Sequence, residues 1–385
     1  MRIQNVFKQF GILLILSFLF AKTSPAQDSN QIKIFGYFQN TLQAWSKYTH
    51  APAHSTFNTQ QLNIFFQKDL NRSWTAFINI EFLNNFSSQK HWGSLNLEEV
   101  WVRYHYDYNF NLKLGLLTPV FNNLNEIKNK TPVLPYIIRP LSYETSFNEF
   151  IPVEVLTPTQ AYAQAYGFIR LNSLKLDYAF YVGNSPNIND KQGNGQTGTD
   201  TTFAFLYGGR VGMRFNRLKM GVSGSYDKDD LFQGEALVNM PDNVNFRQIP
   251  KTRIGADLSY DYDDFSFEGE LINVDMEKNS SLSADLNFYY ATLGYHIADG
   301  LFSYATYWFL EEDLTLNVPV AYEKEYEEIS VYSFGLSQRL LDELVLKVQF
   351  ARVESDQTVN IFNENLVFKN HDNFNIFALA VSVIF

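Results

Sequence analysis

The chain contains repeated stretches in which apolar and polar residues alternate, the period of a β-strand. From Trp74 to Phe82 every second residue is apolar, and the same alternation recurs around Val100–Tyr106 and Leu344–Phe350. The opposite positions carry polar or ionisable groups: Thr75, Asn79, Glu81, Glu99, Arg103, His105, Lys347 and Gln349. A soluble sheet packs its apolar face on a dry core, whereas a transmembrane barrel turns that face to lipid. Because the ionisable groups occupy the other face, the pattern predicts strands around a water-filled interior.

The last stretch, Asn373 to Phe385, shows this pattern with little ambiguity. One face is small or weakly polar, with Ala378, Ala380 and Ser382, and no charge follows Asp372. The other face is wholly apolar: Phe377, Leu379, Val381, Val383 and Phe385. This alternation predicts a final strand that contacts lipid on one side.

Sixteen such stretches occur, joined alternately by seven short turns and eight long loops. We therefore predict an all-β fold, a 16-stranded antiparallel transmembrane β-barrel with both termini on the short-turn side. The alternative is a soluble propeller, but its blades need four short strands per repeat and this chain offers two longer ones. The predicted strands are 32–45, 57–68, 74–82, 95–106, 112–117, 161–170, 174–182, 202–215, 218–226, 252–262, 265–274, 286–297, 301–310, 329–339, 344–353 and 373–385.

The N-terminus predicts export. Arg2 and Lys8 precede an apolar run from Phe10 to Ala21, and small residues follow at Ser24-Pro25-Ala26. This is the pattern of a signal peptide that is cleaved after Ala26, so residues 1–26 are expected to be removed and 27–385 to form the barrel. Aromatic residues make up 16% of the chain, yet no later stretch is apolar enough for a membrane helix.

Charge and motifs exclude several other functions. The net charge of −11 argues against a nucleic-acid partner, and the absence of cysteine excludes disulfides. Pro52 separates His50 from His54, and the acidic run 227–230 lacks the glycine and glutamate of a calcium loop. No helix follows the glycine-rich stretch 193–199, and no Ser/His/acid set stands together. We therefore expect no enzyme activity, no metal and no cofactor.

The connection from Thr118 to Gln160 is the longest in the predicted fold. It spans 43 residues and holds six of the twelve prolines, at positions 119, 132, 135, 140, 152 and 158. Loops of this length are functional or disordered, and the apolar run 132–141 requires burial. We expect this connection, called loop 3 below, to be ordered and at least partly buried. An exposed loop that binds a partner is the alternative.

Charged residues on loop 3 and on the predicted inner wall are the candidate channel-lining set. Acids on the loop opposite bases on the wall would create a transverse field that favours dipolar solutes. Acids also lie on the wall, so the sequence leaves the sign of any ion selectivity open. The loop contributes Glu126, Lys128, Lys130, Arg139, Glu144 and Glu149. The wall contributes Arg103, Lys175, Arg210, Arg214, Lys219 and Arg253, with the acids Glu81, Glu99, Asp177, Asp257, Glu268 and Glu270.

The chain resembles the sixteen-stranded outer-membrane porins of Gram-negative bacteria. The stretch Leu97–Pro119 resembles the segment that leads into the third loop of the phosphate-selective porin O and P group, and the terminal Phe385 resembles the assembly signal of outer-membrane proteins. The resemblance implies an outer-membrane location, contact with outer-membrane lipid and recognition of Phe385 by the barrel-assembly machinery. It also implies a homotrimer whose third loop narrows the channel.

These observations predict a channel for passive diffusion of small polar solutes or ions. The alternative is a non-conducting barrel that serves as a structural or docking subunit of an outer-membrane complex. A transporter of hydrophobic substrates would need an N-terminal plug, for which the residues between Ala26 and Ile32 are too few.

Overall fold

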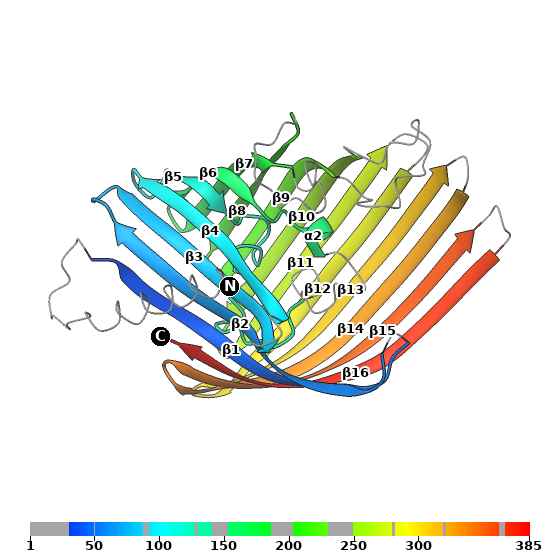
Figure 1. Cartoon of the computed structure of the whole chain (residues 1–385). Helices are drawn as coiled ribbons and strands as arrows, with labels where there is room; N and C mark the ends of the chain where they lie inside the picture. Colours follow the sequence, from blue (N-terminus) through cyan, green and yellow to red (C-terminus); the bar gives the residue numbers. More distant parts are fainter. Residues whose placement is uncertain are drawn as a thin grey trace, which may run out of the picture.

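The computed structural model describes residues 31–49, 51–87, 92–127, 130–140, 153–185, 203–229, 249–278, 282–318, 321–361 and 366–385. Across these residues, sixteen antiparallel strands close into one barrel, as predicted, and each strand pairs with its sequence neighbours (Figure 1). The strands are β1 (Lys33–Trp45), β2 (His54–Asp69), β3 (Trp74–Ser87), β4 (Trp92–His105), β5 (Asn111–Leu117), β6 (Ala161–Leu171), β7 (Leu174–Asn184), β8 (Phe205–Phe215), β9 (Leu218–Asp229), β10 (Ile249–Tyr262), β11 (Phe265–Lys278), β12 (Leu282–Ala298), β13 (Leu301–Val318), β14 (Ala321–Leu341), β15 (Leu344–Ile361) and β16 (Leu366–Ile384). A four-residue helix, α2 (Val153–Leu156), lies in loop 3.

No helix in the described ranges is long and apolar enough to cross a membrane. The predicted signal peptide lies outside the described residues.

The first and last strands close the barrel. Their register runs from Tyr37 opposite Ile384 to Trp45 opposite Ile376. One step further, Gly36 and Phe385 exchange both backbone hydrogen bonds, with N–O distances of 2.8 and 2.9 Å. A closed sheet has no unpaired edge, so its backbone groups are satisfied without water.

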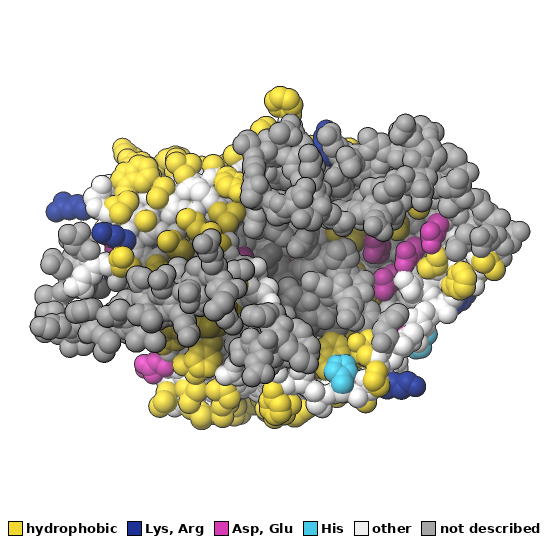
Figure 2. Space-filling view, viewed as in Figure 1, with side chains coloured by type: hydrophobic (Ala, Val, Ile, Leu, Met, Phe, Trp, Pro, Cys, Tyr) yellow, Lys and Arg dark blue, Asp and Glu magenta, His cyan; other side chains and the backbone are white. Residues whose placement is uncertain are grey.

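The two faces of the wall differ as the alternation predicts. On β16, Phe377 and Val381 are 44% and 40% exposed, whereas Ala378 between them is fully buried. On β15, Phe350 is exposed while Lys347 and Gln349 are buried on the opposite face. Hydrophobic side chains accordingly gather on the outer surface seen in Figure 2. The outer face therefore offers lipid an apolar surface, and the polar positions point inward.

Short turns join the strands at one end of the barrel. Three of them place Asn172, Asn216 and Asp263 at positive φ, with values of 55°, 54° and 49°. Asn and Asp tolerate this left-handed region better than other residues with a side chain, which explains their use in two-residue hairpins. The turns stand where the sequence predicts them.

The opposite strand ends extend further than predicted. The predicted loops 311–328 and 354–372 are wrong, because β13 continues to Val318, β14 begins at Ala321, and β15 and β16 occupy most of the second range. About nine to eleven residues cross a bilayer, and beyond that depth both faces meet water. Beyond that depth the alternation of apolar and polar residues stops, but the strands remain paired. Glu311 lies opposite Glu328, and the side chain of Lys324 is 2.9 Å from that of Asp313. Acidic side chains gather near these strand ends in Figure 2.

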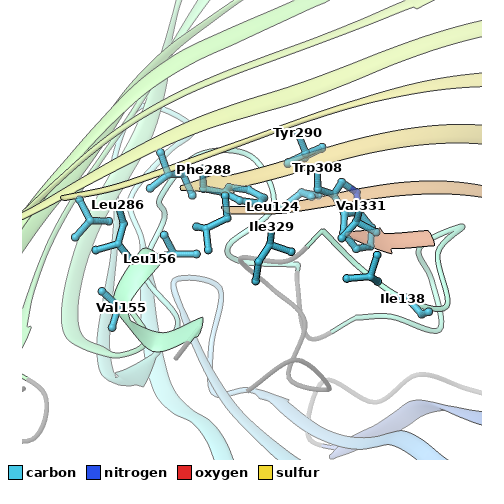
Figure 3. Close-up of a cluster of buried hydrophobic side chains, with 14 of the residues drawn as sticks. Leu124, Ile138, Val155, Leu156, Leu286, Phe288, Tyr290, Trp308, Ile329 and Val331 are labelled. Atoms are coloured by element: carbon cyan, nitrogen blue, oxygen red, sulfur yellow. The ribbon is translucent and has the colours of Figure 1, made fainter. Parts of the chain in front are cut away.

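Part of the inner wall is apolar, which the prediction of a polar interior missed. Inward residues of β10–β16 and β1 form one buried cluster with side chains of loop 3. Figure 3 shows Leu124, Ile138 and the α2 residues Val155 and Leu156 facing Phe288 and Trp308 among others. The wall residues of this cluster are Trp45, Ile249, Ile272, Val274, Met276, Ala284, Leu286, Phe288, Tyr290, Trp308, Leu310, Ile329, Val331, Ala351, Val353, Phe374 and Ile376. The barrel thus holds a small hydrophobic core on one side of its interior.

Candidate functional site: loop 3 and the basic inner wall

The first part of loop 3 is bound to inward-facing side chains of β9 and β11. The backbone N–H groups of Asn123 and Leu124 both donate to Glu270 Oε1, at 2.9 and 2.8 Å. The N–H of Asn122 donates to Ser223 Oγ at 2.8 Å. A carboxylate that accepts two backbone N–H groups makes charge-assisted bonds, which are roughly twice as strong as neutral ones. Glu270 therefore positions this turn of the loop on the inner wall.

The middle of loop 3 is bound to β15. Gln349 Oε1 accepts hydrogen bonds from the N–H groups of Ile137 and Ile138 at 2.8 and 2.7 Å, and its Nε2 donates to the carbonyl of Ile138 at 3.0 Å. Lys347 Nζ donates to the carbonyls of Thr131 and Pro132, at 2.8 and 3.2 Å. Two side chains of alternate positions on one strand thus bond six backbone groups of the loop, including the carbonyl of Tyr136 at 3.4 Å from Lys347.

Tyr136 adds contacts to β11 and β12. Its hydroxyl donates to Glu268 on β11 and lies 3.3 Å from Thr292 Oγ1 on β12. Burial, reinforced by the carboxylate of Glu268, raises the pKa of Tyr136 well above its usual value. The phenol therefore remains protonated and continues to donate this bond at any physiological pH.

The end of loop 3 is bound to β10 through α2. Arg253 Nε donates to the carbonyl of Val155 at 2.7 Å, and its Nη1 lies 2.9 Å from Asp227 Oδ2. Lys251 Nζ lies 3.7 Å from the other oxygen of Asp227, and all three side chains are buried. The described parts of loop 3 therefore contact β9, β10, β11, β12 and β15 from the inside. Gln60 and Gln61 on β2 and Gln164 on β6 also bond backbone groups of the loop. The hydrophobic core lies between the loop and the strands β10 to β16.

Four basic residues form a row across the inner wall near the short-turn end. Arg170 lies opposite Lys175, Lys175 opposite Arg214, and Arg214 opposite Lys219, on four successive strands. Directly opposed like charges destabilise a sheet, so such a row is costly to keep. The nearest carboxylate, Asp177, lies 3.7 Å from Arg214 and is shared with Arg210. The Arg214 side chain is 49% exposed, so this basic row remains open to solvent.

Two of the predicted wall arginines are buried in ion pairs instead. Arg210 donates to both carboxylate oxygens of Asp257, at 2.8 and 2.7 Å, and also bonds Asp177. Arg253 is fully enclosed with Asp227 and the backbone of α2. Arg103, by contrast, is partly buried on β4, and Lys219 bonds Asn123 of loop 3. Of the predicted bases, Arg210 and Arg253 are therefore buried in separate ion pairs, and the others are more accessible.

The loop charges predicted for the site are only partly described. Glu126 lies 3.7 Å from Lys113 on β5, a strand outside the predicted group of bases. Lys130 is half-buried and Arg139 is buried. Lys128, Glu144 and Glu149 lie outside the described residues. Three inward residues were not predicted from the sequence as part of the site, namely Lys113, Arg170 and Lys347, although strand parity places all three on the inner face.

These features define a membrane channel protein: an apolar outer wall, a closed barrel of sixteen strands and charged groups on the inside. The chain belongs to the Gram-negative porin family, whose sequence model matches residues 13–358. It is an outer-membrane barrel that forms a channel for passive diffusion. No curated protein matches its sequence.

Several solved structures share the fold at low sequence identity. An anion-selective porin from Comamonas acidovorans is 12% identical, has a TM-score of 0.61, and the match covers 92% of this chain and 100% of that one. OmpT, an outer membrane protein of Vibrio cholerae, is 11% identical with a TM-score of 0.60, and the match covers 94% of this chain and 100% of OmpT. Its trimer form has a TM-score of 0.55 at 11% identity, with 93% and 100% covered. At these identities the likeness concerns the fold alone.

Proposed function

We propose that this porin conducts small polar solutes with a preference for anions, through a lumen that loop 3 narrows. The observation that carries the proposal is the basic row Arg170–Lys175–Arg214–Lys219, four cations on adjacent strands of the inner wall. A surface of one charge sign concentrates counter-ions in a confined channel, because its low-dielectric walls focus the field. The passage needs no cofactor and no catalysis, since the concentration gradient drives it.

Loop 3 supplies the constriction in this proposal. Its bonds to Glu270, Gln349 and Lys347 hold it inside the lumen. The strands β4 to β9 carry Arg103, Lys113 and the basic row, of which Lys113 and Lys219 also reach Glu126 and Asn123 of the loop. Solutes would therefore pass along the part of this wall that stays open to solvent, next to Arg214. Of the residues predicted from the sequence, Arg103, Lys175, Arg214, Lys219, Glu126 and Lys130 belong to this passage, while Arg210 and Arg253 support the wall.

The remaining parts of the proposal concern assembly. The chain would be exported by a signal peptide cleaved after Ala26 and recognised by the barrel-assembly machinery through Phe385. It would function as a homotrimer in the outer membrane, by analogy with the trimer form of the Vibrio cholerae protein. The stretch Leu97–Pro119, together with the basic row, supports a place near the phosphate-selective O and P group.

The reversal potential across a KCl gradient tests the anion preference. We expect wild-type channels to be more permeable to chloride than to potassium. The triple variant R170Q/K175Q/R214Q should lose most of that preference, because it removes three charges from the row without removing a contact to loop 3. The matched control R72Q/R217Q changes two arginines in exposed short turns and should leave the potential unchanged. A wild type that prefers potassium would overturn the proposal, as would an unaltered ratio in the triple variant.

A further inference from the structure

A series of aromatic rings crosses the inner wall from β1 to β4. The ring centroids are 5.1 Å apart for Phe35 and Phe65, 5.6 Å for Phe65 and Phe77, and 4.7 Å for Phe77 and Trp101. Phe77 stands directly opposite Trp101, and Phe35 opposite Phe65, so the rings share one face. That face also carries Asn79, Glu81 and Arg103, which makes it the inner one.

Basic side chains stand over the rings where the series continues to β7. Lys113 Nζ lies 5.0 Å from the centroid of Trp101 and 5.4 Å from that of Tyr166. Lys175 Nζ lies 3.5 Å from the centroid of Phe168. An ammonium ion within about 6 Å of a ring is attracted by the ring quadrupole, which holds it without neutralising its charge. These cations therefore stay in place next to apolar surface and keep their charge. Lys113 also lies 3.7 Å from Glu126, so a solute carboxylate competes with that acid there.

The rings are partly open to the lumen. Phe65 is 4% exposed, but Phe77, Trp101, Tyr166 and Phe168 are only half-buried. On the inner face they gain nothing from lipid, unlike the outward Trp74 and Tyr104 pair. They leave apolar surface on the polar side of the barrel, beside the cations of β5 and β7.

We propose that this aromatic track, made of Phe77, Trp101, Lys113, Tyr166, Phe168 and Lys175, binds carboxylates that carry an apolar ring. The proposal deepens the proposed function, since it names a class of solute for the same anion-preferring passage. The ring of such a solute packs on Trp101 and Phe77, and its carboxylate pairs with Lys113 or Lys175. The solute enters the lumen more readily because its ring is buried against the aromatic side chains of the track. The neighbouring basic row then offers further cations to the carboxylate of the solute.

Competing solute classes use only half of this surface. An inorganic anion or acetate pairs with the cations but leaves the rings without a partner. A neutral sugar stacks on the rings but gains nothing from the charges of Lys113 and Lys175. Only a solute with both an apolar ring and a negative charge matches rings and cations at the spacing that the track provides.

Block of the single-channel potassium chloride current by added benzoate tests the proposal. We expect benzoate to halve the current at a concentration about tenfold lower than acetate does, a difference of about 1.4 kcal/mol in binding. Glucose should block less than benzoate. Equal block by benzoate and acetate would overturn the proposal, and so would a stronger block by glucose.

Variants locate the site. Trp101→Leu removes the central ring and keeps an apolar residue, so the benzoate advantage should fall to less than threefold while acetate block is unchanged. Trp74→Leu replaces an aromatic residue on the outer face and serves as the matched control. If Trp101→Leu fails to fold, Tyr166→Leu takes its place and should give the same loss. An advantage that persists in folded variants of Trp101 and Tyr166 would contradict the assignment.

The outcome separates this proposal from the anion preference itself. A channel that prefers chloride but blocks equally with benzoate and acetate keeps the proposed function and loses the aromatic track. A channel without chloride preference that still shows the tenfold benzoate advantage, lost in Trp101→Leu, keeps the track and loses the proposed selectivity.

Discussion

Replacing Lys347 with Met is expected to raise the single-channel conductance and to make the open current unsteady. The side chain is 2% exposed, and its Nζ donates to Gln39 Oε1 at 2.9 Å as well as to the carbonyls of loop 3. Methionine keeps the length but leaves those carbonyls without a donor. Each buried polar group left unpaired costs about 1–3 kcal/mol. A loss of about 3 kcal/mol raises the detached population of the loop about a hundredfold.

The conductance of K347M, recorded in planar bilayers next to wild type, checks this prediction. Lys369→Met is the matched control, because Lys369 is exposed near the loop end of β16 and should behave like wild type. Adding Gln349→Ala should increase the effect, since Gln349 satisfies the neighbouring residues of the loop. An unchanged current in the folded double variant would show that the loop does not limit conduction.

Replacing Asp257 with Asn is expected to lower the free energy of unfolding by about 3 kcal/mol, the usual loss when one partner of a buried ion pair is removed. The side chains of Arg210 and Asp257 are 4% and 1% exposed, and the pair is bidentate. Asn cannot accept both guanidinium bonds, so Arg210 retains only Asp177. Urea unfolding in lipid vesicles, followed by tryptophan fluorescence, measures the change.

Two further variants identify the cause. Arg210→Met/Asp257→Leu removes both charges and should recover most of the loss, because a hydrophobic pair avoids the cost of burying ions. Asp263→Asn breaks the exposed pair with Arg217, at 2.9 Å, and should produce no measurable change. A double variant as unstable as D257N would mean that side-chain shape, rather than the unpaired charge, causes the destabilisation.

The sequence predicts the strands well where lipid imposes a pattern on them. In β3 and β16 one face touches lipid and the other does not, so alternation reveals both the strand and its orientation. Asn172 and Asn216 mark hairpins because few other residues adopt positive φ. Where the strands pass beyond the bilayer, as from Glu311 to Val318, this constraint ends and the sequence looks like a loop.

The interior core is difficult to predict for a different reason. On β12 both Phe288 and Tyr289 are apolar, yet the first is buried in the lumen and the second is 37% exposed outside. Such a strand has no polar face, so hydrophobicity cannot identify the inner one. The partner of Phe288 is loop 3, whose course depends on contacts between residues more than a hundred positions apart, such as Ile137 and Gln349.

For the candidate site, the sequence predicts which residues face the interior, because alternate residues of a strand lie on opposite faces. Parity places Arg210 and Arg214 on the same inner face, but only three-dimensional packing distinguishes them. Arg210 meets Asp257 two strands away, whereas Arg214 stands among other cations. The row itself is visible only once the register is known, because Arg170 and Lys219 are far apart in the sequence and aligned by the hairpins between them.

The single-channel conductance of the purified wild-type protein in a planar bilayer tests the central claim most directly, namely that the charged inner wall encloses water. The structure predicts discrete, uniform current steps whose height increases with KCl concentration. A protein that migrates as a folded, heat-modifiable barrel but gives no steps in potassium chloride or sodium acetate would contradict it. In that case loop 3 and the hydrophobic core would seal the lumen, and the barrel would act as a structural subunit.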